Sequence, residues 1–360
     1  MSKNRYSVFS GSGCYIPENI IKNEYFNNHT FYESNGKKLE KSTAEIIDKL
    51  FQITGIKERR YVDDNLLTSD IGYLAAQEAL SSADIDKETL DYIIVGHNFG
   101  EVKQENKKVD IIPSIAARIK NKLGIKNPYT VAYDITFGCP GWLQGVIQAD
   151  YFIKSGDAKR ALVIGAETLS RIADPHDRDA MIYSDGAGAL IVEPVESENP
   201  VGVVNKITRS DSQNQAYFLY MGKSYNPDYK DDTLFVKMEG RKLYQYAITT
   251  IPDLIKKCID DSGITINDIK KILIHQANEK MDIAMLERLF KLYNINEIPK
   301  NIMPMTISWL GNNSVATLPI MYDLIVKEKM DNHNFQSGDY IVLASVGAGM
   351  NANAMLYRLP

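Results

Sequence analysis

Part of the chain's pattern recurs after half its length. The segment IDKETLDYIIVGHN (85–98) aligns without a gap on ITINDIKKILIHQA (264–277), at an offset of 179 residues. The segment SGDAKRALVIGAE (155–167) aligns on SGDYIVLASVGAG (337–349) at an offset of about 181 residues, with a two-residue gap. One such match arises easily by chance, but two matches in the same order and at the same offset predict a duplicated unit. The 360 residues are therefore expected to form two similar halves.

Both halves are expected to have an α/β architecture. Short runs rich in valine and isoleucine, bounded by glycine, aspartate or proline, have the pattern of buried strands. Segments with the periodicity of amphipathic helices lie between them. Strands that alternate with helices predict a layered α/β fold. The expected strands are 90–97, 129–135, 160–167, 188–195, 270–277, 301–307 and 340–347, and the expected helices are 69–83, 113–124, 140–156, 243–263 and 315–329.

Composition excludes several classes of protein. The net charge of −5 and the pI of about 5.7 lack the basic excess of a nucleic-acid-binding domain. No apolar run approaches the roughly 18 residues of a membrane span, and the N-terminus lacks the pattern of a secretory signal. Three cysteines are too few for a disulfide framework, and the five histidines show no metal-ligand spacing. We expect a cytoplasmic enzyme without a metal, a nucleic-acid partner or a membrane span.

Two polar stretches fit neither half of the duplication, which we divide into residues 1–195 and 196–360. These stretches are residues 25–45 and 98–110. Solvated loops are the simplest interpretation of both. The alternative is a lid or a loop that contacts a partner, because long insertions in compact domains often carry function.

Cys139 has the sequence context of a nucleophile. It lies in YDITFGCPGWLQG, between an expected strand and an expected helix, and Pro140 follows it where a helix can begin. A thiol at that point faces the positive end of the helix, which lowers its pKa. The alternative is a buried core cysteine. Cys258, within an amphipathic segment, is expected to be a core cysteine, and Cys14 also lacks the context of a nucleophile.

His275 and Asn312 are the other candidates for catalysis. His275 ends an apolar run, and α/β folds place their sites at the carboxyl ends of strands. His97 has the equivalent place in the first half, so a structural role for either histidine stays open. Asn312 lies in the turn WLGNNS, where a turn or cap asparagine is the alternative. The glycine clusters 185–190 and 345–351 leave backbone N–H groups free to hold an oxyanion, and neither has the spacing of a nucleotide-phosphate loop.

Together these motifs resemble the thiolase-fold condensing enzymes, and most closely β-ketoacyl-acyl-carrier-protein synthase III. The resemblance rests on the cysteine of FGCPG, on HQAN, on the GN-S turn and on DGAGA, in this chain. It extends over nearly the whole chain through TGIKERR, SGDAKRALVIGAE, DPHDR and MEGRKLYQYA. The family has a duplicated five-layer αβαβα fold, which agrees with the half-chain repeat.

The resemblance implies an acyl transfer followed by a decarboxylative Claisen condensation in fatty-acid or related lipid or polyketide synthesis. Cys139 would carry the acyl group, and His275 and Asn312 would donate hydrogen bonds to the enolate of a malonyl-type or β-ketoacyl-type thioester. The backbone N–H groups of Cys139 and Ala348 would hold the later oxyanion. No cofactor is implied beyond the acyl-carrier-protein or coenzyme A thioesters themselves. Relatives are homodimers in which the neighbouring subunit closes the acyl tunnel.

Some binding positions of the family pattern are present and others differ. Arg178 in DPHDR matches a nucleotide contact, although an internal salt bridge is its alternative, and Lys280 and Arg288 match carrier-docking positions. Lys49 and Ile53 stand where coenzyme A-primed members stack a Trp and an Arg on the adenine. We therefore expect the acyl donor to arrive on a carrier protein or as another thioester.

The sequence leaves two other functions open and disfavours three. A specialised ketosynthase that joins two long acyl units, as in dialkylresorcinol or flexirubin-type pathways, stays open, as does an acyltransferase or thioesterase that forms no carbon–carbon bond. Hydroxymethylglutaryl-coenzyme A synthase is disfavoured because the Asn312 turn suits decarboxylation better than that family's glutamate-based chemistry. A non-catalytic subunit is disfavoured because Cys139 and its two partners are all retained. A cysteine protease is disfavoured by the duplication.

Overall fold

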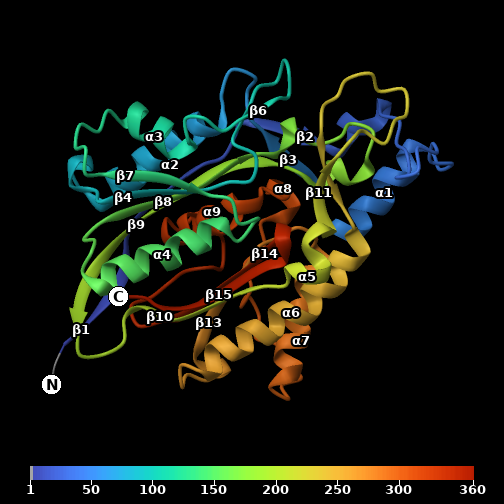
Figure 1. Cartoon of the computed structure of the whole chain (residues 1–360). Coiled ribbons are helices and arrows are strands. Elements are labelled where there is room, and N and C mark those ends of the chain that lie inside the picture. The colour runs from blue at the N-terminus through green and yellow to red at the C-terminus, as the bar shows by residue number, and fades with distance from the viewer. Residues whose placement is uncertain (1–2) are drawn as a thin grey trace.

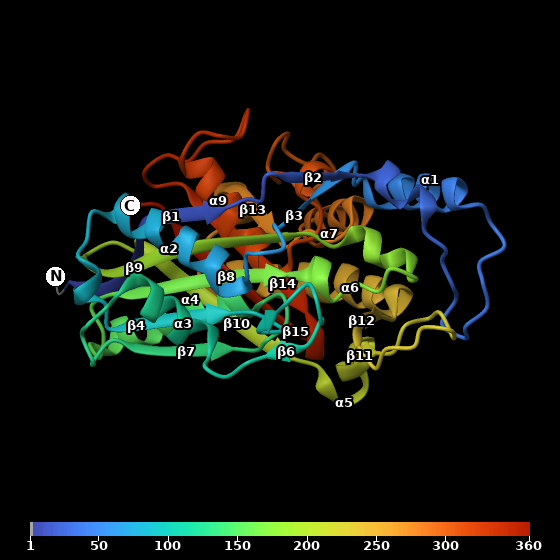
Figure 2. The same ribbon diagram turned by 90° about the horizontal axis from the view of Figure 1, so that it is seen from above.

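Two β-sheets lie at the centre of the molecule, with helices between them and on both outer faces (Figure 1). The computed structural model describes residues 3–360. Its layers alternate as α, β, α, β, α (Figure 1), and the view from above looks down through these layers onto the helices that cover the first sheet (Figure 2). This is the expected five-layer α/β fold.

The first sheet has the strand order β1-β9-β8-β4-β7 and the second has the order β10-β15-β14-β13. In the first sheet β4 runs parallel to both β7 and β8, and the other pairs are antiparallel. In the second sheet β13 and β14 are parallel, and the other pairs are antiparallel. The bounds are β1 Asn4–Tyr15, β4 Tyr92–Gly96, β7 Val131–Ile135, β8 Ala161–Thr168, β9 Asp185–Ser197, β10 Gly202–Ser210, β13 Ile269–Ile274, β14 Tyr340–Gly347 and β15 Asn351–Arg358.

The two internal repeats correspond to the same pair of strands in each sheet. Residues 85–98 and 264–277 contain β4 and β13, and residues 155–167 and 337–349 contain β8 and β14. In each sheet the two repeated strands are parallel neighbours. The four strands of the second sheet thus follow the order of four strands in the first.

Each sheet is buried on both faces by its helices. Helices α2 (Thr68–Ala83) and α3 (Ile115–Leu123) cover the outer face of the first sheet, α4 (Gly141–Ser155) and α9 (Thr317–Val326) lie between the sheets, and α6 (Gly240–Asp260) and α7 (Glu279–Leu292) cover the second (Figure 1). Neighbouring residues of one strand therefore enter different cores. Leu162 packs with α2 and α3, whereas Val163 packs with α4. Burial on both faces explains why the sequence shows continuous apolar runs.

Shorter elements surround this frame. Helix α1 (Thr43–Thr54) lies beside α7, and the hairpin β11 (Leu219–Gly222) and β12 (Phe235–Met238) precedes α6. The remaining elements are β2 Asn19–Lys22, β3 Glu58–Tyr61, β5 Glu101–Val102, β6 Val109–Asp110, α5 Ser212–Gln215 and α8 Ile307–Leu310. None of the helices within residues 3–360 has the length and apolar character of a bilayer-spanning helix.

One expected strand is wrong. Residues 301–307 form no strand, and Ile307 already begins α8. The Ile272 N–H donates to the Ile302 carbonyl at 2.8 Å, so this segment does lie against the edge of β13. Pro304 has no N–H to donate, which prevents the ladder from continuing. The expected helices and the other six expected strands are confirmed.

The two polar stretches differ from each other. Residues 29–42 form an irregular loop in which Tyr32 and Lys38 pair in an antiparallel β-bridge. The loop ends where α1 begins, at a capping box between Ser42 and Glu45. Residues 98–110 contain the β5–β6 hairpin, and Glu101 and Val102 are fully buried there. The interpretation as a solvated loop is therefore wrong for residues 100–102, whereas residues 103–106 and 108–110 are exposed as expected.

Candidate active site

Cys139 lies between the end of β7 and the start of α4. Gly138 has a φ of +69°, and a Cβ atom added there would collide with the backbone of Ala348. Pro140 is the N-cap of α4, one residue before the first helical position that we expected for it. The turn therefore places the thiol beside the N-terminus of α4 and against the 347–349 turn.

The three expected catalytic side chains line one cavity of about 380 Å³. Cys139 is half-buried, whereas His275 and Asn312 are buried. His275 directly follows β13, and Asn312 follows α8 and pairs with Tyr183 in a parallel bridge. Residues far apart in the sequence, from both halves, thus meet at one place.

Ser314 fixes the orientation of Asn312. The Ser314 N–H donates to Asn312 Oδ1 at 2.9 Å, which leaves the amide nitrogen of Asn312 as its free donor. The Ser314 hydroxyl donates to Cys139 Sγ at 3.2 Å. Ser314 has a φ of +51°, a left-handed conformation that costs energy for residues other than glycine.

His275 is held through its Nδ1 atom. Nδ1 lies 3.1 Å from Thr317 Oγ1, and Thr317 Oγ1 lies 2.7 Å from Asn313 Oδ1. Burial lowers the pKa of His275 to about 4, so its imidazole is neutral at physiological pH.

The surroundings of Cys139 raise the pKa of its thiol to about 11. The largest cause is burial of the sulfur, and the nearby Glu167 carboxyl adds to it, while the Ser314 hydrogen bond opposes both. The expectation that the helix end lowers this pKa is therefore wrong in sign, because desolvation outweighs it. The resting form of Cys139 is the thiol.

His97 is distinguished from His275 by its partners. Its Nδ1 accepts the Gly100 N–H at 3.0 Å, so Nε2 carries the hydrogen and donates to Asp134 at 2.9 Å. Both ring nitrogens of His97 are used in holding the loop to β7 and α3. His97 is thus structural despite its equivalent place at a strand end.

Above the three side chains the cavity has apolar walls. The hairpin β11–β12 and helix α6 contribute Leu219, Met221, Val236, Met238 and Leu243. An outer cavity of about 710 Å³ shares part of this wall, namely Met238, Leu243, Ala277 and Met281. The two cavities are therefore neighbours that share this apolar wall.

Basic residues line the outer cavity. Lys38, Lys41, Lys49 and Arg241 have no ion-pair partner among the described residues. Arg178 also lines this cavity, and its guanidinium lies 3.8 Å from Glu33, so the cavity position and the salt bridge that we considered for it occur together.

Lys280 and Arg288 lie on α7 and are exposed. Neither lines the outer cavity, and Arg288 lies 3.7 Å from Asp253. Lys49 and Ile53, from α1, do line that cavity. Arg178 therefore lines the outer cavity, whereas Lys280 and Arg288 lie on the surface outside it.

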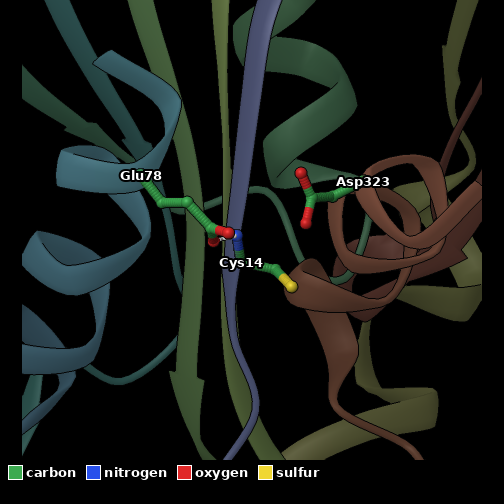
Figure 3. Close-up of side chains that lie close together, drawn as sticks. All are labelled: Cys14, Glu78 and Asp323. Atoms are coloured by element: carbon green, nitrogen blue, oxygen red, sulfur yellow. Dashed lines mark hydrogen bonds between the residues drawn. The ribbon is translucent and has the colours of Figure 1, made fainter. Parts of the chain in front are cut away.

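The other two cysteines are remote from the cavity. Cys258 is fully buried, which confirms its expected core position. Cys14 lies with Glu78 and Asp323 on β1, α2 and α9, and its N–H donates to Glu78 (Figure 3). The Lys327 ammonium donates to Glu78 at 2.5 Å and lies 2.8 Å from Asp323. This ammonium already pairs with both carboxylates.

Several residues of the site were missed in the sequence analysis. The contact between Ser314 and Asn312 could have been predicted from the sequence, because an asparagine side chain often accepts the N–H of the residue two positions later. Asn98 and Glu167 lie beside Ser314 at the ends of β4 and β8, and Thr317 is one helical turn beyond Asn313. These contacts depend on how strands are paired, which no local motif reports.

Family models match two parts of the chain. The model described as 3-oxoacyl-(acyl-carrier-protein (ACP)) synthase III matches residues 133–212, and the model of the C-terminal part of this enzyme matches residues 259–359. The matched ranges contain Cys139 in the first case and His275 and Asn312 in the second.

Individual relatives match over the full length. A β-ketoacyl-(acyl-carrier-protein) synthase III of Bradyrhizobium sp. is 30% identical over 356 residues, 98% of each chain, and one of Staphylococcus aureus is 31% identical over 349 residues, 97% of each chain. The crystal structure of 3-oxoacyl-(acyl-carrier-protein) synthase III from Aquifex aeolicus has a TM-score of 0.78 at 28% identity, covering 98% of this chain and 99% of the other. The corresponding Thermus thermophilus structure has a TM-score of 0.80 at 27% identity and the same coverage. The chain belongs to the 3-oxoacyl-(acyl-carrier-protein) synthase III family and is an acyl-transferring condensing enzyme of the thiolase fold.

Proposed function

We propose that this enzyme transfers an acyl group to Cys139 and condenses it with a malonyl-type thioester, with His275 and Asn312 as the donors of the decarboxylation step. The observation that carries this proposal is the single cavity that all three side chains line, which shares an apolar wall with the outer cavity. A thiol, a neutral imidazole and an amide are the groups that this two-step reaction needs.

The first step is a thioester exchange. The Cys139 sulfur attacks the carbonyl carbon of the incoming thioester, and the bond from that carbon to the carrier sulfur breaks. The net proton transfer is from the Cys139 thiol to the departing carrier thiolate, which leaves as a thiol. Because the resting group is a thiol with a raised pKa, the hydrogen bond from Ser314 helps by stabilising charge on the sulfur.

The second step is loss of carbon dioxide from the malonyl group. The carbon–carboxylate bond breaks, and its electron pair forms an enolate whose charge rests on the thioester oxygen. The Asn312 amide nitrogen and the His275 Nε2–H would donate to that oxygen. Donors of this kind, fixed before the reaction, contribute roughly 2.7–4 kcal/mol each in comparable sites.

The His275 role requires hydrogen on Nε2, and Asn313 can place it there. The Nδ2 atom of Asn313, as placed, is buried and has no partner within residues 3–360. Turning this amide by 180° sets Nδ2 beside Thr317 Oγ1 and satisfies the buried donor. The Thr317 hydroxyl then donates to His275 Nδ1, and the imidazole carries its hydrogen on Nε2.

The third step joins the two acyl units. The enolate carbon attacks the thioester carbon on Cys139, and the oxygen of that carbonyl becomes an oxyanion until the bond to Cys139 breaks. The backbone N–H groups of Cys139 and Ala348 are proposed to hold it. Gly347 supports this assignment, because any side chain there would collide with the backbone nitrogen of Cys139. The released thiolate takes a proton from solvent.

The acyl donor is proposed to be a carrier-protein thioester. Lys38, Lys41, Lys49 and Arg241 surround the outer cavity, which suits the phosphate of a pantetheine arm and an acidic carrier. We propose that Arg178 contacts the same phosphate. Lys280 and Arg288 are proposed as more distant contacts of the carrier, and no cofactor beyond these thioesters takes part.

A homodimer through the edge of the first sheet is proposed as the working assembly. Strand β7 ends the sheet order, so its outer edge is open among the described residues. Large apolar side chains are exposed beside it, with Tyr129 at 85%, Ile112 at 82% and Val131 at 48%. An open edge with exposed apolar neighbours suits pairing with a second copy. We also propose that residues 1–195 and 196–360 are the two duplicated halves.

The experiment that tests this function is product analysis with an acyl-carrier thioester and a ¹³C-carboxyl-labelled malonyl-carrier thioester. Condensation yields labelled carbon dioxide and a β-ketoacyl product that is two carbons longer than the acyl donor. Transfer or hydrolysis alone yields the exchanged thioester or the free acid without elongation, and that result would overturn the proposal. A β-ketoacyl product formed by joining two long acyl units would assign the specialised ketosynthase reaction instead.

A further inference from the structure

Asn98 links the nucleophile to a buried acid that the proposed reaction does not use. It follows β4 and lines the cavity of Cys139. Its backbone N–H and its Nδ2 both donate to Glu167 Oε2, at 2.9 and 2.6 Å, and Nδ2 also donates to Ser314 Oγ at 3.0 Å. Ser314 in turn donates to Cys139.

The hydrogens in this chain of contacts can be assigned. Glu167 Oε2 accepts the backbone N–H of Asn98, so the Asn98 amide faces it with nitrogen and not with oxygen. An amide nitrogen has two hydrogens, and here one goes to Glu167 and the other to Ser314 Oγ. The Ser314 hydroxyl has a single hydrogen, and since its oxygen already accepts from Asn98, that hydrogen is directed at Cys139 Sγ.

The pairing of β4 with β8 fixes the positions of the residues in this series of hydrogen bonds. Strands β4 and β8 are parallel, with Gly96 beside Gly165, so two residues beyond this pair Asn98, just past the end of β4, meets Glu167 within β8. Glu167 is 1% exposed. Ser314, which accepts from Asn98 and donates to Cys139, has an unfavourable positive φ. Backbone strain at a residue that touches the nucleophile indicates that its placement is functionally constrained.

We propose that Asn98 is a positioning residue for the nucleophile: held by Glu167, its amide directs the Ser314 hydrogen to the Cys139 sulfur. The inference rests on the proposed role of Cys139. Other titratable groups facing the sulfur are Tyr183 and His275, which line the same cavity from other elements. Neither contacts Asn98 among the described residues, so changes at Asn98 act on the sulfur through Ser314.

The test is the pH dependence of Cys139 alkylation by iodoacetamide, read from the Cys139 peptide by mass spectrometry without any substrate. Alkylation follows the thiolate fraction, so losing one hydrogen bond to the sulfur lowers the rate at pH 8 by roughly fivefold. We expect this loss for Asn98→Ala and for Ser314→Ala. The double variant falls no further than Ser314→Ala alone, because the two residues act as one unit.

A second variant separates positioning from packing. Asn98→Asp keeps the size of the side chain, but its carboxylate accepts the Ser314 hydrogen and removes it from the sulfur. We therefore expect Asn98→Asp to be alkylated more slowly than Asn98→Ala, whereas a packing role predicts the reverse order. The matched control is Asn205→Ala, which removes a half-buried asparagine that lines neither cavity and should leave the alkylation profile unchanged.

Two results would overturn the inference. One is an unchanged alkylation profile in folded Asn98→Ala, and the other is additive loss in the double variant. These results are distinct from failure of the proposed function, which shows as the absence of an acyl adduct on Cys139 in the wild-type enzyme. A protein that forms the adduct normally but shows either result keeps its function and loses only the role of Asn98.

Discussion

The backbone N–H of Ser314 donates to Asn312 Oδ1 at 2.9 Å and thereby selects which end of the Asn312 amide is free. A change that keeps this contact and removes the donor tests the role of the amide. Asn312→Asp still accepts the Ser314 N–H, but it has no hydrogen to offer an enolate. We expect release of carbon dioxide from a malonyl thioester to fall roughly 100-fold or more.

The complementary variant for this prediction is Cys139→Ala. It removes the acylated group but leaves Asn312 and His275 in place, so it should still release carbon dioxide. The two activities can be followed separately, by labelled carbon dioxide and by intact mass. If Asn312→Asp decarboxylates at the wild-type rate, the amide is not the donor.

The hydrogen on His275 Nε2 depends on Asn313 through Thr317. Asn313→Asp can only accept from the Thr317 hydroxyl, which then accepts from Nδ1 and leaves Nε2 without hydrogen. Decarboxylation should fall roughly 10- to 100-fold, while acylation of Cys139 changes little. The ¹⁵N shifts of the imidazole report the tautomer directly, and an unchanged tautomer in Asn313→Asp would refute this mechanism.

Lys237 on β12 is the positive charge of a buried cluster beside the cavity. Its ammonium is 2.5 Å from Asp174 and 3.3 Å from Asp177, and its side chain is 1% exposed. Lys237→Met leaves two carboxylates without their partner, so we expect the free energy of unfolding to fall by about 3–5 kcal/mol. Denaturant titration measures this change. The exposed Lys242 is the matched control, and Lys242→Met should cost less than about 1 kcal/mol.

The lysines of the outer cavity are expected to act on binding of the carrier. Lys41→Glu should raise the KM for an acyl-carrier thioester severalfold with little change in kcat, and the effect should shrink as salt is added. Arg288→Glu, on α7 outside the cavity, should have a smaller effect. Steady-state kinetics at two ionic strengths provide the comparison. A larger effect of Arg288→Glu than of Lys41→Glu on the KM would contradict this prediction and would place the docking surface on α7 instead of at the outer cavity.

The sequence identified the repeated strands by their local signature, whereas the catalytic roles of Cys139, His275 and Asn312 were expected from the family resemblance. Runs of valine and isoleucine gave β4 and β13, and a helix start marked Cys139. The wrong predictions have a common cause, which is that they depend on contacts between segments distant in the sequence. Residues 301–307 have the composition of a strand, yet Pro304 interrupts the pairing with β13, and only the tertiary structure shows this.

Local sequence patterns also could not predict the pKa of Cys139 or the contact between Asn98 and Glu167. The helix end at Cys139 suggested a lowered thiol pKa, but the burial of the sulfur and the nearby Glu167 decide the sign. Asn98 lies in a stretch whose polarity suggested a solvated loop. Its contact with Glu167 follows from the parallel pairing of β4 with β8, which neither segment encodes alone.

The central claim is that the acyl group passes through Cys139, and peptide-level mass spectrometry after brief incubation with an acyl-carrier thioester tests it most directly. We predict that the mass of the acyl group appears on the peptide containing Cys139 and disappears when a malonyl thioester is added. Cys139→Ala should show no adduct. An adduct that persists in folded Cys139→Ala, or a wild-type enzyme that elongates the acyl chain without ever carrying it on Cys139, would contradict the account.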